Sequence, residues 1–332
     1  MKRTADHALF DQAKQNKNDE FYTLLPDIER ELAHYVGHFR DKSVFCNCDD
    51  PTRSNFFRYF IQHFKALGLK KVVAACLGKP GGNLFEPFRP GFYYEYSGTQ
   101  EKTPSMDDVT FFRGDGDFRG AESVALLEEA DIVVTNPPFS LFREFVAQLV
   151  AHQKKFLVIG NINAITYKEI FRLIQNNQAW MGVNMGRGIS GFMVPEHYGL
   201  YGLEARVDEN GERIVSPNNC MWLTNLDLPA RHETIPLVKT YAGNEGEYPR
   251  FDNCDAINVD RTQNIPGDYD GLMGVPITFL HRFNPEQFHI VRFRKGDDDR
   301  DLSIGGKPTY FRILIRKRCH KGATVGGRYA YA

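Results

Sequence analysis

DIVVTNPPFSLFREF, residues 131–145, joins a short apolar strand to a helix through two consecutive prolines and an aromatic residue. Proline cannot donate a hydrogen bond to a sheet, so Pro137 and Pro138 are expected to lie just past the strand. Each proline also holds the residue before it in an extended conformation. The stretch therefore predicts a stiff turn at the end of a central strand, with Asn136 and Phe139 on either side of the prolines.

Alternating strands and helices extend outward from this turn. Apolar runs predict further strands at 43–47, 70–76 and 155–161. Apolar residues at helical spacing predict helices over 54–64, 121–130, 141–152 and 165–177. The stretch 40–180 is thus strand–helix repeated about five times, which predicts an α/β fold with a doubly wound, mostly parallel sheet. Residues 77–100 predict a long loop or hairpin, and short strands and turns are expected after about residue 181.

The composition excludes several classes of protein. The chain has 332 residues, of which 42% are hydrophobic and 25% charged, as in ordinary soluble globular proteins. Its net charge of -1 gives no overall positive field. No apolar run approaches the roughly 18 residues of a membrane span, and the first 20 residues lack the apolar core of a signal peptide, so we expect a cytoplasmic protein. The six cysteines form no CxxC pair and no His/Cys cluster, so no metal is expected.

The turn at Asn136 is placed where a doubly wound sheet performs its chemistry, at the carboxyl end of a strand. It offers the amide oxygen of Asn136, the peptide oxygen of Pro137 and the aromatic face of Phe139. Two acceptors beside a ring suit the planar amine of a nucleobase. The alternative is a simple Pro-Pro turn that closes the strand, with Phe139 packed in the core.

Asn-Pro-Pro-Phe resembles the (Asn/Asp)-Pro-Pro-aromatic signature of S-adenosylmethionine-dependent DNA adenine-N6 methyltransferases. Further segments resemble one branch of these enzymes, the EcoRI-type modification methyltransferases, over about residues 10–318. They are NDEFYT (18–23), FCNCDDP (45–51), GDGDFR (114–119), SPNNC with WLTNLD (216–227), and MGVPITFL with FNPEQF (273–288). The resemblance implies a class I (Rossmann-like) methyltransferase fold, S-adenosyl-L-methionine as cofactor and double-stranded DNA as substrate. It also implies N6-methyladenine as product, GAATTC as target, and a place in a type II restriction-modification system.

The same resemblance assigns the catalytic turn to Asn136, Pro137, Pro138 and Phe139. The exocyclic amine of adenine is a weak nucleophile, so acceptors on its two N–H bonds would orient its lone pair toward the methyl group. Adenine inside a duplex cannot reach such a turn, so it must be flipped out and stacked on Phe139.

The cofactor residues are less legible, because the glycine-rich turn usual in the family is replaced by residues 45–51. Phe21, Tyr22 and Thr23 match the motif that closes over the methionine end, although they could equally be a hydrophobic staple. Asp49 or Asp50 would hold the amino group or the ribose, unless either is a helix N-cap. Asp115 or Asp117 matches the position that contacts the cofactor adenine, unless GDGDF is only a Gly-Asp turn.

DNA binding would have to come from local charge. Residues 290–321 hold ten Lys/Arg against four Asp, a net charge of +6, which suits phosphates unless it is merely a solvated strand face. The expected DNA contacts are Arg292, Arg294, Lys295, Arg316 and, in a flexible loop near the target base, Arg187. That loop, residues 186–191, spells GxGxxG, but Pro195 and the pattern after it argue against the helix of a dinucleotide site.

We expect residues 1–227 to form the cofactor-binding catalytic domain and 228–332 the target-recognition, DNA-binding region. An enzyme that flips one adenine per visit gains nothing from symmetry, so a monomer on DNA is expected. Two other hypotheses stay open: a methyltransferase acting on RNA or on a protein glutamine amide, and a catalytically inactive DNA-binding relative.

Overall fold

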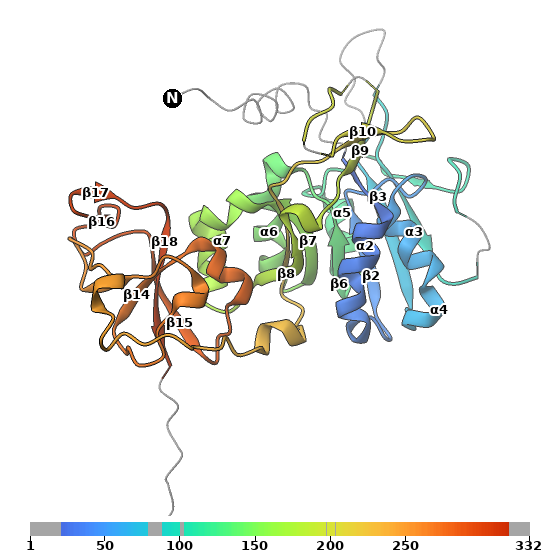
Figure 1. Ribbon diagram of the computed structural model, residues 1–332. Helices are drawn as coiled ribbons and strands as arrows, with labels where there is room; N and C mark the ends of the chain where they lie inside the picture. Colours follow the sequence, from blue (N-terminus) through green and yellow to red (C-terminus); the bar gives the residue numbers. More distant parts are fainter. Residues whose placement is uncertain (1–20, 79–87, 100–102, 197, 203, 319–332) are drawn as a thin grey trace, which may run out of the picture. The chain divides into compact units, whose positions relative to one another are not determined.

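The computed structural model describes residues 21–78, 88–99, 103–196, 198–202 and 204–318 (Figure 1). The chain forms two compact units that divide between Leu228 and Pro229. Their functional assignment to catalysis and target recognition stays a prediction.

Unit 1 is built on a sheet of eight strands in the order β5-β4-β3-β2-β6-β7-β12-β8. These strands are β2 (Ser43–Asn47), β3 (Lys71–Cys76), β4 (Phe92–Tyr96), β5 (Thr110–Phe111), β6 (Ile132–Thr135), β7 (Lys155–Asn161), β8 (Trp180–Met185) and β12 (Cys220–Thr224). The four central strands, β3-β2-β6-β7, are parallel, whereas every strand outside them pairs antiparallel with its neighbour. Unit 1 is therefore a mixed α/β structure whose sheet is parallel at its centre.

Helices cover both faces of this sheet. They are α2 (Leu25–Leu32), α3 (Asn55–Gln62), α4 (Phe64–Leu67), α5 (Ala121–Glu129), α6 (Phe142–Ala151) and α7 (Lys168–Gln175), with short 3-10 turns at Ala33–His38, Phe139–Leu141, Ile162–Thr166 and Gly186–Gly188. Side chains of α2, α3 and α4 share one core cluster with Ile159 of β7. The ring of Phe142 in α6 lies against Gly160, where a Cβ would meet it at 2.4 Å. Since neighbouring strand residues point to opposite faces, α6 covers the other side of the sheet.

Helix α3 shows how local sequence sets an element. The hydroxyl of Ser54 accepts hydrogen bonds from the backbone N–H groups of Phe56 (3.1 Å) and Phe57 (3.3 Å), which caps the helix. Phe56, Phe57 and Phe60 are then buried in the core. The predicted helix over 54–64 is confirmed as α3, although it ends at Gln62 and α4 begins at Phe64.

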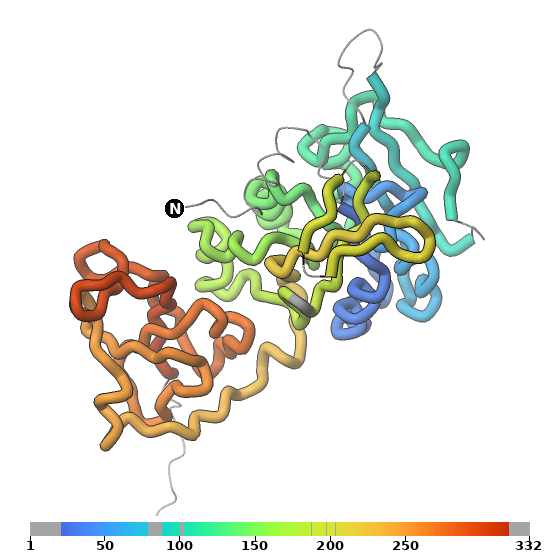
Figure 2. The backbone as a smooth tube through the Cα atoms, turned by 45° about the horizontal axis from the view of Figure 1, so that its top comes forward, coloured from blue at the N-terminus to red at the C-terminus, as the bar shows by residue number. Residues whose placement is uncertain are grey.

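A second, smaller sheet belongs to the same unit. Its order is β1-β9-β11-β10, formed by β1 (Tyr22–Thr23), β9 (Phe192–Val194), β10 (Arg206–Val207) and β11 (Arg213–Val215). The yellow trace in Figure 2 follows this sheet through β9, β10 and β11. Its antiparallel pairing sets Tyr22 opposite Met193 and Thr23 opposite Phe192.

Unit 2 contains a four-stranded sheet in the order β13-β14-β18-β15 and a two-stranded hairpin. The strands are β13 (Ala256–Asn258), β14 (Leu272–Pro276), β15 (Phe288–Phe293), β18 (Arg312–Lys317) and, in the hairpin, β16 (Ser303–Ile304) and β17 (Lys307–Pro308). Short 3-10 turns at Pro229–His232, Glu245–Glu247, Thr262–Asn264 and Ile277–Arg282 join them. A small core of Phe251, Ala256, Leu302 and Leu314 packs within this unit.

The predicted strands at 43–47, 70–76, 131–136 and 155–161 are confirmed as β2, β3, β6 and β7. The helix predicted from residue 165 begins only at Lys168, because Ile162–Thr166 forms a 3-10 turn. The expected parallel sheet holds at the centre. Its edges differ because Phe92–Tyr96, inside the predicted loop or hairpin, and Cys220–Thr224 add antiparallel strands.

Candidate active site

The order of the main sheet reverses at β2. The chain continues from β2 to β3 on one side and later places β6 on the other side, so β2 and β6 are neighbours. Open α/β sheets bind their ligands in the crevice outside the carboxyl ends of the strands at such a switch point. The segments that leave β2 and β6 there begin at Cys48 and Asn136.

The turn after β6 presents an unused hydrogen-bond acceptor. The Nδ2 of Asn136 donates to the carbonyl oxygen of Phe21 at 2.7 Å. Its Oδ1 is buried and has no hydrogen-bond partner among the described residues. An unsatisfied buried acceptor costs about 1–3 kcal/mol, so its persistence at a switch point indicates a ligand donor. Pro137 is buried and Pro138 half-buried, and the 3-10 turn at Phe139 follows directly.

Phe139 lies between the core and this turn. Its ring is half-buried and packs partly against the main core cluster. It also stacks on Phe21, with centroids 6.1 Å apart and an interplanar angle of 15°, and meets the ring of Phe192 edge-on at 6.2 Å. Phe139 therefore has core contacts and also belongs to an aromatic group beside Asn136. Its role in base stacking stays a prediction.

The segment after β2 holds a buried carboxyl group that is hydrogen-bonded to the residue before Asn136. Asp49 is 6% exposed and accepts a hydrogen bond from the Ser54 hydroxyl at 2.6 Å. The hydroxyl of Thr135, the residue before Asn136, hydrogen-bonds to Asp49 and to the carbonyl oxygen of Asn47. Burial raises the pKa of Asp49 from 3.8 to about 7, against the hydrogen bonds from Ser54 and Thr135, which lower it. No lysine or arginine is among the groups that set this pKa in the described chain.

Residues 45–51, which stand where the family usually has a glycine-rich turn, still contain a backbone conformation that favours glycine. Cys48 has a φ of 83°, in the left-handed region that most side chains avoid. This turn lets the N–H groups of Cys48 and Asp49 both donate to the carbonyl oxygen of Ala75, at 3.0 and 2.8 Å. A strained non-glycine residue of this kind is typical of functional sites.

The helix N-cap alternative for the two aspartates is wrong, because Ser54 caps α3. Asp50 instead accepts hydrogen bonds from the N–H of Thr52 (2.8 Å) and from its hydroxyl (2.7 Å), which shapes the loop before the helix. Asp50 is half-buried. Of the two, Asp49 is the carboxyl group that lies at the switch point.

The GDGDF segment lies against the end of β3. The N–H of Gly78 donates to the carbonyl oxygen of Asp115 at 2.7 Å. Burial is the main cause that raises the pKa of the Cys48 thiol, and the charge of Asp117 adds a smaller contribution. Asp117 forms an ion pair with Arg119 at 2.6 Å, and this hydrogen-bonded partner lowers the pKa of Asp117. Asp115 is exposed, and its Oδ1 accepts from the N–H of Asp117 at 3.1 Å, as in the Gly-Asp turn alternative.

The N-terminal motif, Phe21–Thr23, lies beside the same site. Tyr22 and Thr23 form β1, and Asn55 donates its Nδ2 to the carbonyl oxygen of Thr23 at 2.9 Å. The guanidinium of Arg53 lies over the Tyr22 ring, 5.0 Å from its centroid. The structure thus gathers Phe21–Thr23, the Asp49 segment and the Asn136 turn, all of them predicted from the sequence. Sequence reasoning missed Thr135 and Asn55, and only the position of Thr135 at the strand end could have indicated it.

The loop at 186–191 is hydrogen-bonded to α2, and its expected flexibility stays a prediction. Asp27 of α2 accepts from the N–H and hydroxyl of Ser190, both at 2.8 Å, and Arg30 donates to the carbonyl oxygen of Gly188 at 2.8 Å. Strand β9 follows the loop where a dinucleotide site needs a helix. The side chain of Arg187 lies outside the described residues.

Three of the predicted DNA contacts in unit 2 already have acidic partners. Arg292 pairs with Asp297 at 3.1 Å, and Asp301 binds both Arg294 (2.7 Å) and Lys295 (3.1 Å). Arg316 is exposed and forms no ion pair with any described residue. Both acidic partners, Asp297 and Asp301, are already subtracted in the net charge of +6 of residues 290–321. Among the predicted contacts of unit 2, Arg316 is the one without an acidic partner in the described part of the chain, so it is the one already available to phosphate.

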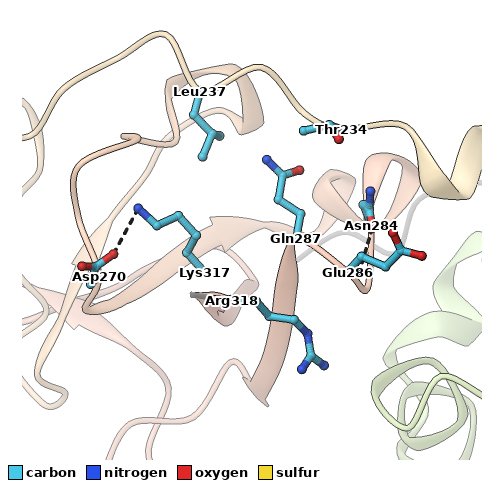
Figure 3. Close-up of a pocket in the computed structure, with 8 residues that line it drawn as sticks. All are labelled: Thr234, Leu237, Asp270, Asn284, Glu286, Gln287, Lys317 and Arg318. Carbon is cyan, nitrogen blue, oxygen red and sulfur yellow. Dashed lines mark hydrogen bonds and ion pairs between the residues drawn. The ribbon is translucent and has the colours of Figure 1, made fainter. Parts of the chain in front are cut away.

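A cleft of about 380 Å³ in unit 2 is lined by none of these residues (Figure 3). Two acids and two bases line it, and Lys317 is paired with Asp270 at 3.0 Å. Its charges balance and it contains none of the predicted site residues, so it is a weaker candidate than the switch point. Among the described residues, no group of three His, Cys, Asp or Glu side chains could hold a metal ion. None of the described helices is both long enough and apolar enough to cross a membrane.

Comparisons with known proteins agree on one family. The family model described as "Adenine-specific methyltransferase EcoRI" matches residues 9–318. Type II methyltransferase M.EcoRI of Escherichia coli is 59% identical over 322 residues, covering 96% of this chain and 99% of the relative. Type II methyltransferase M.MpnI of Mycoplasma pneumoniae is 37% identical over 330 residues, covering 93% and 98%. No solved structure matches the chain.

Proposed function

Because the chain belongs to the EcoRI family of adenine-specific methyltransferases, we propose that it transfers a methyl group from S-adenosyl-L-methionine to N6 of adenine in double-stranded DNA. Its target is GAATTC, and it is the modification enzyme of a type II restriction-modification system. Residues 1–227 form a Rossmann-like, class I catalytic domain, and residues 228–332 recognise the target. The division of the chain between Leu228 and Pro229 supports this assignment.

The unsatisfied Oδ1 of Asn136 is the single observation that carries the proposal. In the proposed reaction it accepts one N–H of the adenine amine, and the carbonyl oxygen of Pro137 accepts the other. The lone pair on N6 would then form the bond to the methyl carbon as the carbon–sulfur bond breaks, S-adenosylhomocysteine would leave as the neutral thioether, and the methylated N6 would lose one proton to water. Such a transfer depends on orientation and on fixed dipoles, and it needs no strong base.

The aromatic group beside Asn136 fits a base that has left the duplex. Phe139 offers a face for stacking, which is worth about 1–3 kcal/mol per base. Phe21 and Phe192 surround it with further apolar surface. Flipping of the target adenine is therefore the step that brings its amine to Asn136.

The residues at the switch point fit the cofactor chemically. When bound, S-adenosylmethionine supplies a methyl group activated by a positive sulfonium, and it also carries an ammonium group. Asp49 is a buried carboxyl group without a basic partner in the described chain, so it suits one of these cations. Phe21, Tyr22 and Thr23 would enclose the methionine end. Asp50, Asp115 and Asp117 line the neighbouring loops.

Duplex DNA is the proposed partner, bound by one protomer per site in the cytoplasm. Its phosphates would be held by exposed cations such as Arg316, and affinity would fall steeply with salt. Arg187, Arg292, Arg294 and Lys295 stay proposed contacts, and the last three must exchange an acidic partner for phosphate.

A substrate comparison tests the proposal. Purified protein is incubated with methyl-labelled cofactor and, separately, a GAATTC duplex, the same duplex with the site scrambled, total RNA and denatured protein. Asn136→Ala, treated identically, serves as the control. Label in the GAATTC duplex alone is expected. Label in RNA or protein would support the rival methyltransferases, and DNA binding without label would support an inactive relative.

A further inference from the structure

Two side-chain amides hold strand β1 and the residue before it, Phe21, along one edge. Asn136 donates to the carbonyl oxygen of Phe21 at 2.7 Å, and Asn55 donates to that of Thr23 at 2.9 Å. Successive carbonyl groups of a strand point to opposite edges, so these alternate residues present theirs on the same edge. One amide comes from the catalytic turn and the other from the first residue of α3.

Further hydrogen bonds connect the two asparagines through Asp49 at the switch point. Asp49 is hydrogen-bonded to Ser54, which precedes Asn55, and to Thr135, which precedes Asn136. The two asparagines bind the carbonyl oxygens on either side of Tyr22. Asn55 is only 7% exposed, so water does not substitute freely for its hydrogen bond.

The contact with Phe21 decides which end of the Asn136 amide faces the substrate. The oxygen and nitrogen of an amide group have nearly the same shape, so a half-turn exchanges them at little steric cost. A flipped Asn136 would present its NH2 to the adenine amine, and two donors cannot hydrogen-bond. The Phe21 carbonyl favours the orientation that leaves Oδ1 unsatisfied and facing the substrate.

We propose that Asn55 is a positioning residue for methyl transfer, acting through β1 on the Asn136 amide. This rests on the proposed function of Asn136. The contact with Phe21 also explains why residue 136 is an asparagine. An aspartate would supply two acceptors, but its carboxylate could not donate to the Phe21 carbonyl oxygen. Asn136→Asp is therefore expected to lose activity despite its equal size.

The test compares two identical substitutions. Asn55→Leu removes the donor to the carbonyl oxygen of Thr23 at 2.9 Å. The control, Asn225→Leu, removes a donor to the carbonyl oxygen of Lys154, also at 2.9 Å, and in addition the acceptor of the Phe156 N–H, so it disturbs the fold at least as much but at the amino end of β7. Both should lower the midpoint of thermal unfolding. Only Asn55→Leu should lower kcat at saturating DNA and cofactor, by roughly tenfold, as expected for one neutral hydrogen bond. Equal kcat values for the two variants would overturn the proposal.

A second readout separates positioning from general damage. In an Asn136→Asp background, where the contact with Phe21 is already lost, Asn55→Leu should cause no further loss of kcat. A further tenfold loss there would mean that Asn55 acts independently of the amide.

The same residue can be followed without turnover. NMR of the Asn136 side-chain amide should show slow hydrogen exchange in the wild-type protein and in Asn225→Leu, and fast exchange in Asn55→Leu. Slow exchange in all three would overturn the proposal. If the wild-type protein methylates no DNA, the proposed function fails, while this measurement still reports on the positioning of Asn136.

Discussion

Asp49→Asn is predicted to make unit 1 more stable and the enzyme less able to bind its cofactor. The carboxyl group is buried and its pKa is about 7, so near neutral pH folding requires either a proton or a buried charge. Asparagine has the same shape and no charge. Its NH2 can donate to the Thr135 hydroxyl while that hydroxyl donates to Asn47, so no polar atom is stranded.

The size and sign of the effect follow from the pKa. Because the folded pKa lies above the ordinary value of 3.8, the stability contributed by Asp49 is complete below about pH 4 and is lost as pH rises through 7. Each pH unit between the two pKa values is worth about 1.4 kcal/mol, so the full loss is roughly 4 kcal/mol. Between pH 5 and pH 8, Asp49→Asn should gain about 2–3 kcal/mol over the wild-type protein.

Urea unfolding followed by tryptophan fluorescence measures this gain. The two tryptophans, Trp180 and Trp222, both lie in unit 1, so their signal reports that unit. The difference in the free energy of unfolding between the variant and the wild-type protein removes the contribution of every group that titrates equally in both. Calorimetric titration with S-adenosylmethionine should show weaker binding to the variant. A stability difference that stays constant from pH 5 to pH 8 would refute the assigned burial of a titrating carboxyl group.

Three further predictions concern catalysis and DNA binding. Asn136→Ala should lower kcat by at least about 10²-fold while DNA affinity in a filter-binding assay stays near that of the wild-type protein; near-normal turnover would remove Asn136 from the mechanism. Phe139→Trp should stay active, whereas Phe139→Ala should lose roughly 1–3 kcal/mol of base stacking; equal kcat/KM values would leave Phe139 only a core role. Arg316→Ala should reduce the salt dependence of DNA binding by about one phosphate contact, and an unchanged slope would contradict that contact.

The central fold could be predicted because its signals are local. Strands such as Ser43–Asn47 have an apolar run at their centre and are buried on both faces of the sheet, and two prolines follow the end of β6. The position of Asn136 at a strand end followed from those signals alone. The function then depended on a motif that spans only four residues.

The second sheet and its contacts could not be predicted in the same way. Strand β1 has two residues and β9 has three, and such runs carry no detectable alternation. Strand β1 pairs with residues about 170 positions away, and Asn55 meets Thr23 across 32 positions. The neutralisation of Arg294 by Asp301 is a geometric fact that a count of charges does not contain.

Mapping the modified base tests the central claim most directly. A plasmid with one GAATTC site is incubated with the protein and S-adenosylmethionine, then divided between digestion to nucleosides and challenge with an endonuclease that cuts unmodified GAATTC. The proposed chemistry at Asn136 predicts N6-methyladenine as the new nucleoside, located at the inner adenine of the site, together with resistance to cleavage. A methylated cytosine, N6-methyladenine outside this site, or unmodified DNA from a protein that binds the site tightly would contradict it.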